Sequence, residues 1–177
     1  MCRDACMLIV FGGLPGTGKT TLARAVAEEH HAMYLRIDTI EQALRSSGLL
    51  AGDVGPAGYL VAYALAETNL RLGQIVVADC VNPLGITRDA WKKVSCDACC
   101  TIVEVEVVCS DIVEHRRRVE TRCVDVVGLV LPTWEQVVKR DYEPWHRPRI
   151  AVDTADRTVA ETLTELRSRI DEMCSVL

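Results

Sequence analysis

The sequence predicts a layered α/β fold, in which a parallel β-sheet is covered by helices on both faces. Apolar runs of about four to eight residues alternate with longer segments of helical period, which is typical of parallel strands joined by crossover helices. Several helix starts also carry capping residues. A chain of 177 residues is long enough for one domain with a substantial core, and we expect residues 1–177 to form a single domain.

Each element follows from its local pattern. Short apolar runs predict five strands, at Met7–Phe11, Met33–Ile37, Ile75–Ala78, Ile102–Val108 and Arg149–Val152. Segments of helical period predict helices at Lys19–Glu29, Thr39–Arg45, Ala57–Leu72, Arg88–Val94, Asp111–Arg122, Trp134–Tyr142 and Val159–Met173. Reciprocal capping pairs support three of the helix starts, namely Thr39 with Gln42, Thr133 with Gln136, and Thr158 with Glu161. The glycine-rich segment Gly48–Pro56 and the apolar segment Val124–Pro132 are expected to be loops.

The composition excludes several classes of protein. The net charge is -5 and the charged residues are mixed in sign, so the chain is neither disordered nor generally attractive to nucleic acid. Its apolar stretches are far shorter than the roughly 18 residues that a membrane helix needs. We therefore expect a cytoplasmic protein with no membrane partner, either a monomer or a homodimer.

A phosphate-binding loop follows the first predicted strand. Gly13, four further residues and then Gly18-Lys19-Thr20 form the Walker A pattern, in which backbone N–H groups surround phosphates at a helix N-terminus. Lysine at this position reaches the β- and γ-phosphates, and the following hydroxyl binds Mg²⁺. We therefore expect ATP and Mg²⁺ as cofactors. The expected nucleotide-binding residues are Gly13, Pro15, Gly16, Thr17, Gly18, Lys19, Thr20 and Thr21.

Arg36 and Asp38 lie where the second predicted strand ends. In open α/β sheets ligands bind outside the carboxyl ends of the strands, so both side chains are candidates for binding a phosphate acceptor. A carboxylate there can orient an acceptor hydroxyl or take its proton, which is the catalytic role expected of Asp38. The alternative is that Asp38 only caps the helix expected to start at Thr39.

The third predicted strand ends in Asp79, the position of a carboxylate that holds Mg²⁺ through water or contacts the acceptor. Cys80 follows, where an ATPase that drives mechanical work carries a glutamate to activate water. This difference argues against hydrolysis as the purpose of the site. Asn82 and Arg88 are further candidates for acceptor binding, and a turn-forming asparagine and a solvated arginine are the alternatives.

Four arginines lie close together between positions 116 and 122 of an otherwise acidic chain. Arg118 and Arg122 are one helical turn apart and are expected to share a helix face. Above bound phosphates, such a pair would neutralise the charge that develops during transfer, so both are candidate catalytic residues. The alternative is a solvated helix face that pairs with Glu114 and Glu120.

We expect the nine cysteines to be free thiols. Their number is odd, the chain is not small, and an ATP-binding site is typical of a reducing compartment. Cys96 and Cys99 have the spacing of a redox or zinc pair, but no second pair accompanies them.

With these motifs in this order, the sequence resembles the AAA-type P-loop kinases, ATP-binding relatives of zeta toxins, chloramphenicol phosphotransferase, gluconate kinase and the kinase domain of polynucleotide kinase. The resemblance covers nearly the whole chain. It implies a three-layer fold of the nucleotide-kinase type with five parallel strands in the order 2-3-1-4-5, and an arginine-bearing lid at about residues 111–133. It also implies Lys19 and Thr20 at the phosphates and Mg²⁺, Asp38 at the acceptor, and Arg118 and Arg122 in the lid.

The leading hypothesis is an ATP-dependent phosphotransferase that moves the γ-phosphate to a hydroxyl of a small molecule. A polynucleotide 5′-kinase or a nucleotide-sugar kinase toxin is an alternative, although the acidic composition argues against a long strand-binding groove. A module of another class, an ATPase or a nucleotide-dependent switch, has less support because the guanine-binding motif is absent. The loop Val124–Leu131 is more apolar than phosphate binding requires, which predicts either a hydrophobic acceptor or a contact with another subunit.

Overall fold

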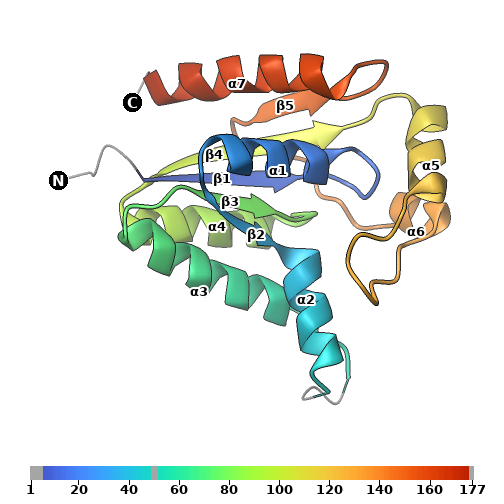
Figure 1. Ribbon diagram of the computed structural model, residues 1–177, viewed down its shortest axis with the longest axis horizontal. Helices are drawn as coiled ribbons and strands as arrows, with labels where there is room; N and C mark the ends of the chain where they lie inside the picture. The colour runs from blue at the N-terminus through green and yellow to red at the C-terminus, as the bar shows by residue number, and fades with distance from the viewer. Residues whose placement is uncertain (1–5, 49–51, 176–177) are drawn as a thin grey trace.

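Five parallel strands form one sheet in the computed structural model, which describes residues 6–48 and 52–175 (Figure 1). They are β1 (Met7–Gly12), β2 (Met33–Arg36), β3 (Val76–Asp79), β4 (Thr101–Val108) and β5 (Ile150–Asp153). Their order is β2-β3-β1-β4-β5, and each neighbouring pair is parallel, which confirms the predicted fold class. All five strands therefore end at the same edge of the sheet.

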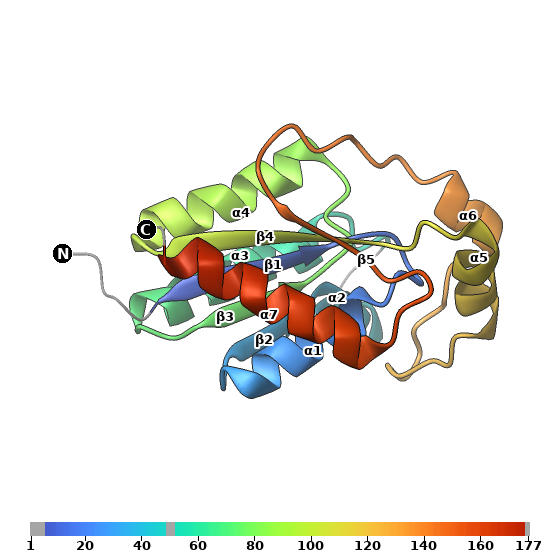
Figure 2. The same cartoon turned by 90° about the horizontal axis from the view of Figure 1, so that it is seen from above.

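Helices cover both faces of this sheet (Figures 1 and 2). Helices α1 (Lys19–Glu29) and α7 (Val159–Ser175) pack on one face, and α3 (Ala57–Arg71) and α4 (Gly85–Ala98) pack on the other. Three further helices lie at the carboxyl edge of the strands, namely α2 (Ile37–Ser46), α5 (Ile112–Thr121) and α6 (Trp134–Val138). Over the described ranges, no helix has the length and apolar character needed to cross a bilayer.

The core consists of two apolar layers, one on each side of the sheet. The first joins Leu22 and Val26 of α1 and Leu166 of α7 to the valines and isoleucines that one face of the sheet presents. The second joins Ala62 and Ala66 of α3 and other residues of α3 and α4 to the opposite face. Because both faces are covered, the strands are apolar along most of their length, as the sequence pattern indicates.

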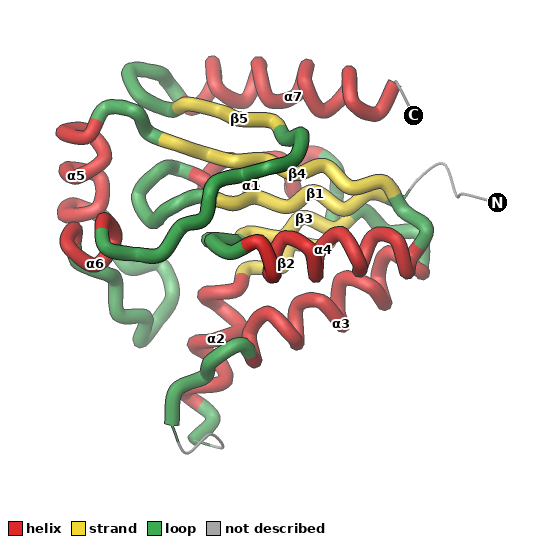
Figure 3. Tube along the Cα trace, turned by 180° about the vertical axis from the view of Figure 1, so that it is seen from behind, coloured by secondary structure: helices red, strands yellow, loops and turns green. Residues whose placement is uncertain are grey.

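Strand β4 departs from this pattern, because two buried glutamates alternate with its valines. Glu104 and Glu106 point toward the face covered by α4, where the connection from α6 to β5 runs back over the sheet (Figure 3). Arg147 Nε lies 2.7 Å from a Glu104 carboxylate oxygen, and Arg149 pairs with Glu106 in the same way. A buried charge is tolerated when it is paired, so these two ion pairs hold that connection against β4.

Most element boundaries fall within a few residues of prediction, and α1 matches completely. The capping pairs Thr133–Gln136 and Thr158–Glu161 are confirmed by reciprocal hydrogen bonds. The pair expected at Thr39 is wrong, because β2 ends at Arg36 and α2 already begins at Ile37. Of the predicted loop Gly48–Pro56, residues 49–51 lie outside the described part of the chain.

The cysteines differ from expectation at one pair. Cys6 and Cys100 form a disulfide that joins the residue before β1 to the residue before β4. The free-thiol interpretation is therefore wrong for these two, because adjacent parallel strands bring positions 94 residues apart in the sequence next to each other. Cys80, Cys96, Cys99, Cys109 and Cys123 are free, as predicted.

Removing this disulfide is expected to lower the free energy of unfolding by about 2–4 kcal/mol, since it closes a long loop in the unfolded chain. Urea denaturation of the protein with and without dithiothreitol measures this difference. The Cys6→Ser protein should resemble the reduced protein and should not respond to the reductant. As a control, Cys123→Ser changes an exposed free thiol and should keep the full response. An unfolding midpoint that is the same with and without reductant would contradict the assignment.

Candidate active site

The phosphate-binding loop lies between β1 and α1, at the carboxyl edge of the sheet. The backbone N–H of Gly13 donates to the carbonyl of Val81 at 3.0 Å, and the Thr17 hydroxyl donates to the carbonyl of Leu14 at 2.9 Å. Gly13 and Gly16 have φ angles of 143° and 87°, which favour glycine, and a Cβ on Gly13 would overlap the Val107 carbonyl. The loop therefore delivers the N-terminus of α1 to the site in a fixed position, suited to binding an anion.

Two cavities lie on either side of this loop. The nucleotide-side cavity, about 730 Å³, is lined by Thr20 and Thr21 of α1, by Arg118 and by Thr154 after β5. The acceptor-side cavity, about 1050 Å³, lies between α2, α3, the start of α4 and the lid region, and Asp38 is in its wall. Their linings share two residues, Lys19 and Arg122. Two cations thus lie where the cavities meet.

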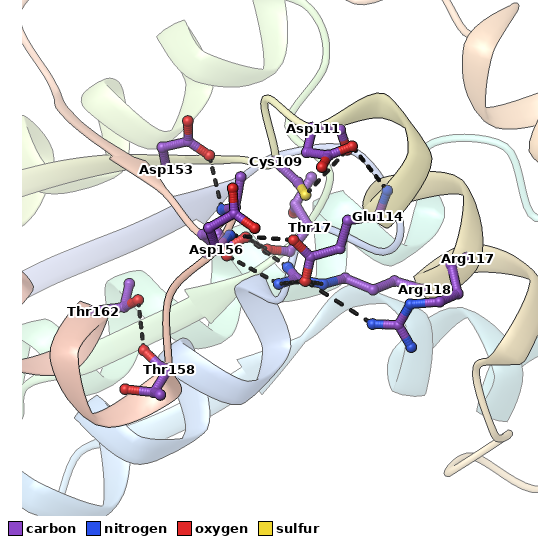
Figure 4. A network of polar contacts seen from close by, with 12 residues as sticks. Thr17, Cys109, Asp111, Glu114, Arg117, Arg118, Asp153, Asp156, Thr158 and Thr162 are labelled. Carbon is purple, nitrogen blue, oxygen red and sulfur yellow. Dashed lines mark hydrogen bonds and ion pairs between the residues drawn. The ribbon is translucent and has the colours of Figure 1, made fainter.

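Thr154 connects the phosphate-binding loop, β4 and the lid on the nucleotide side. Figure 4 shows Arg118 and Glu114 of the lid beside Thr17 of the loop. Its hydroxyl lies 2.9 Å from the carbonyl of Thr17, and Arg118 donates to the hydroxyl and the carbonyl of Thr154 at 2.7 and 2.9 Å. Arg118 also pairs with Glu114, one turn earlier in α5, at 2.6 Å. Its guanidinium is therefore held in the wall of the nucleotide-side cavity. Sequence reasoning missed Thr154, because a threonine after a strand carries no pattern of its own.

A second contact joins the lid to the phosphate-binding loop. His115 is buried, and its Nε2 donates to the carbonyl of Pro15 at 2.8 Å, while its ring packs edge-on against Trp134 of α6. Val119 of α5 lies so close to Gly16 that a Cβ there would overlap its side chain. His115 could not be chosen as a functional residue from the sequence, because an isolated histidine has no ligand spacing.

Arg36 makes the third contact between the body of the protein and the lid. Its guanidinium donates two hydrogen bonds to the carboxylate of Asp125, at 2.6 and 3.0 Å, and lies 3.5 Å from Asp38. Arg24 of α1 also pairs with Asp125. The hydrogen bonds from Arg36 lower the pKa of Asp125 to about 2. Arg36 was predicted to bind the acceptor. In the structure its buried guanidinium binds the lid loop, and acceptor binding by Arg36 stays a prediction.

Asp79 ends β3 and is buried. It accepts a hydrogen bond from the hydroxyl of Tyr34 at 2.7 Å and faces Arg36 Nε at 3.8 Å. It is in the lining of neither cavity, so direct contact with an acceptor, as predicted, is not what this geometry provides. A hard cation prefers oxygen ligands, and the Thr20 hydroxyl in the nucleotide-side cavity supplies one that fits Mg²⁺, while the part of Asp79 in binding Mg²⁺ stays a prediction.

Asn82 and Arg88, which are predicted to bind the acceptor, have partners within the protein. Asn82 is buried with a φ of 50°, and its side-chain oxygen accepts from Thr87, which is the turn-forming alternative. Arg88 is also buried. Its three guanidinium nitrogens donate to four backbone carbonyls, and it stacks 4.1 Å from the ring of Trp145. Neither side chain lines a cavity, and Arg88 holds the connection between α6 and β5 in place.

Two catalytic candidates lie in positions that differ slightly from prediction. Asp38 is in the first turn of α2 rather than in a strand end, with its side chain about one third exposed. Arg122 follows the last residue of α5 and has an extended backbone, so it does not share a helix face with Arg118. It is in the lining of both cavities, whereas Arg118 lines only the nucleotide-side cavity.

Comparison with known proteins agrees with this geometry. A family model described as an AAA domain matches residues 8–126, well over half of the chain. The chain belongs to this AAA domain family. A 48-residue stretch of this chain is 46% identical to the uncharacterized protein Rv2004c of Mycobacterium tuberculosis. That match covers 27% of the chain and only 10% of the relative.

Solved structures with this fold include several kinases. The gluconokinase of Sinorhizobium meliloti has a TM-score of 0.69 and 21% sequence identity to this protein, and the match covers 98% of this chain and 96% of the gluconokinase chain. The APS kinase CysC of Mycobacterium tuberculosis, in complex with AMPPNP and APS, has a TM-score of 0.71 and 19% identity over 96% and 99%. Kti12 of Chaetomium thermophilum, in complex with ADP-AlF3, has a TM-score of 0.67 and 22% identity over 91% and 97%. At these identities the likeness establishes the fold, which is that of P-loop kinases.

The ion pair between Arg36 and Asp125 makes a prediction about the lid loop. Replacing Asp125 with Asn should speed tryptic cleavage after Arg122 about fivefold, equivalent to about 1 kcal/mol after allowance for solvent screening of the partly exposed carboxylate. Limited proteolysis followed by mass spectrometry measures the rate. The control, Glu135→Gln, changes an exposed carboxylate of α6.

The same pair predicts a pH dependence. Since the pKa of Asp125 is lowered in the folded protein, the contribution of the pair is complete above about pH 4 and is lost as the pH falls toward about 2. Carbon NMR of the Asp125 carboxyl group should show titration near 2. Titration near the ordinary value of aspartate would show that the contact with Arg36 is not formed in solution.

Proposed function

We propose that this protein is an ATP-dependent phosphotransferase that moves the γ-phosphate of ATP to a hydroxyl of a small molecule. The observation that carries the proposal is the pair of cavities that meet at Lys19 and Arg122, with the phosphate-binding loop on one side and Asp38 on the other. A transfer reaction needs a donor site and an acceptor site that meet at the transferred group, whereas hydrolysis needs only the first.

In this proposal the loop from Gly13 to Thr21 binds the triphosphate. The N–H groups at the start of α1 hold phosphate oxygens, and Lys19, which is almost fully buried, provides positive charge at the β- and γ-phosphates. Mg²⁺, when bound by the Thr20 hydroxyl and by Asp79 through water, supplies further positive charge to the transferred group. Arg118 and Thr154 line the part of the cavity that receives the rest of the nucleotide.

Asp38 is the proposed catalytic carboxylate on the acceptor side. Its carboxylate can accept a hydrogen bond from the acceptor hydroxyl and take its proton as the oxygen attacks the γ-phosphorus. Arg36 lies 3.5 Å from Asp38 and orients it. Arg122, at the junction of the cavities, is placed to neutralise the charge that develops on the transferred phosphoryl group.

Lid contacts support the exclusion of water from this reaction. His115, Arg118 and Asp125 each join the lid to a different part of the phosphate-binding side, so the region is held close to the loop. Water must be kept out because it competes with the acceptor for the γ-phosphate.

The proposal predicts ADP release that depends on an added alcohol. In a broad panel of hydroxyl compounds, the active ones should accelerate ADP release, and Asp38→Asn should lower that rate about 10²- to 10⁴-fold because the general base is lost. Calorimetric titration with ATP should show unchanged affinity in Asp38→Asn and strongly reduced affinity in Lys19→Ala. The matched control is Asp141→Asn, an exposed carboxylate outside both cavities.

If no compound of the panel accelerates ADP release, and Asp38→Asn has the basal rate of the unchanged protein, the proposed phosphotransferase is refuted. Rapid release of ADP without any acceptor would favour an ATPase instead.

A further inference from the structure

The geometry points to an acceptor that combines a hydroxyl group with an apolar body, rather than a sugar, a sugar acid or another polyol. This inference rests on the proposed function, since it specifies the acceptor of the same site. It follows from three features of the acceptor-side cavity. One wall is apolar, several of its polar groups already have partners within the protein, and the cavity is large.

One wall of the cavity is apolar although it is accessible to water. It is formed by α3, the start of α4 and the lid loop, and its largest apolar side chains are Tyr59, Leu60, Tyr63, Leu84, Ile86 and Val130. Leu60, Ile86 and Val130 are 61%, 75% and 87% exposed. Large apolar side chains that gather in a concave surface gain free energy when a ligand covers them.

The hydroxyl groups of this wall already have partners within the protein. Tyr63 donates to the carbonyl of Thr87 at 3.2 Å, and Thr87 donates to the side-chain oxygen of Asn82 at 2.8 Å. The hydroxyl of Tyr59 accepts from the backbone N–H of Asn82 at 3.0 Å. A polyol against this wall would lose water from its hydroxyl groups and find few new partners, which costs free energy for each group buried.

Several polar side chains on the opposite side also have partners within the protein. Glu41 pairs with Arg45 at 3.1 Å, and burial raises the pKa of the Glu41 carboxyl group. Gln42 donates to Ser46, and Gln136 accepts from the backbone of Thr133 in its capping box. Asp38 shares this lining with Lys19 and Arg122, and Arg36 lies 3.5 Å from it. The cavity thus offers a polar end for a hydroxyl and apolar surface for the remainder.

The size of the cavity agrees with this division. About 1050 Å³ is at the upper end of the range for sites that bind drug-sized molecules, and it exceeds the need of a three- or four-carbon alcohol. The lid loop contributes Leu129, Val130 and Leu131 to this wall. Its apolar character exceeds what phosphate binding requires. The apolar loop and the apolar wall are therefore parts of one binding surface.

A homologous series of alcohols tests the inference without knowledge of the natural acceptor. The probes are 1,2-alkanediols from 1,2-propanediol to 1,2-octanediol, with glycerol and gluconate as polar references. The half-saturating concentration for ADP release should fall with each added methylene, by up to about fourfold, which corresponds to about 0.8 kcal/mol per buried CH₂. Glycerol and gluconate should be weaker than 1,2-octanediol.

Variants of exposed leucines on the same helix provide the matched comparison. Leu60→Ser removes apolar surface from the cavity wall, so it should raise the half-saturating concentration of 1,2-octanediol about fivefold and leave that of 1,2-propanediol nearly unchanged. Leu72→Ser removes a comparably exposed leucine just after the last residue of α3, outside both cavities, and should behave as the unchanged protein. Calorimetric titration of each diol in the presence of AMPPNP measures binding independently of transfer.

The outcomes separate the two proposals. ADP release by glycerol or gluconate at concentrations as low as for the long diols, with no effect of Leu60→Ser, would overturn the apolar acceptor and leave the phosphotransferase standing. Calorimetric affinity that rises with chain length and falls in Leu60→Ser, without any ADP release, would support the apolar site and refute the transfer reaction. Affinity that does not depend on chain length, together with no ADP release, would overturn both.

Discussion

The parallel direction of all five strands is the constraint on which the rest of this structure depends. Since every strand ends at one edge, the chain must deliver the phosphate-binding loop, Asp38, Asp79 and Thr154 to the same side of the molecule. Chain segments more than a hundred residues apart thereby become neighbours, as in the hydrogen bond between Thr154 and Thr17. Buried apolar layers on both faces make this arrangement rigid, and the polar chemistry is confined to the edge that those layers leave open.

Across this edge, the lid is held by contacts of three different chemical kinds. The His115 ring makes a hydrogen bond to a backbone carbonyl, Arg118 makes charge-assisted bonds to Thr154, and Asp125 forms an ion pair with Arg36. Arg118 and Asp125 are in the lining of the nucleotide-side cavity, while Pro15, which His115 contacts, is in the lining of the acceptor-side cavity. Binding of either ligand can therefore influence the same lid through different contacts, which is the arrangement expected of a site that must close only when both ligands are present.

The fold and the position of the Gly13–Thr20 loop between β1 and α1 were predictable from the sequence because they depend on local patterns. Apolar runs, capping pairs and the Gly13–Thr20 motif are each set by residues close together in the chain. The partners of the predicted arginine side chains were less predictable, because they come from distant segments of the chain. Arginine is a residue type that often binds ligands. In the folded protein, however, Arg36 contacts the lid and Arg88 contacts the connection from α6 to β5. Thr154 and His115 show the reverse, since neither type of residue is unusual until the fold brings it to the loop. The disulfide between Cys6 and Cys100 belongs to the same class, because strand pairing rather than cysteine spacing determines it.

The buried glutamates of β4 have a consequence for how the last strand joins the sheet. Strand β5 is at the sheet edge and is short, and an apolar pattern of four residues specifies its alignment weakly. Glu104 and Glu106 are two residues apart, as are their partners Arg147 and Arg149, so both pairs form only in one alignment of the two segments. A shift by a single residue would turn both arginines toward the apolar layer beneath α7 and break both ion pairs. Complementary charge, rather than hydrophobicity, thus selects the register in which this sheet is completed.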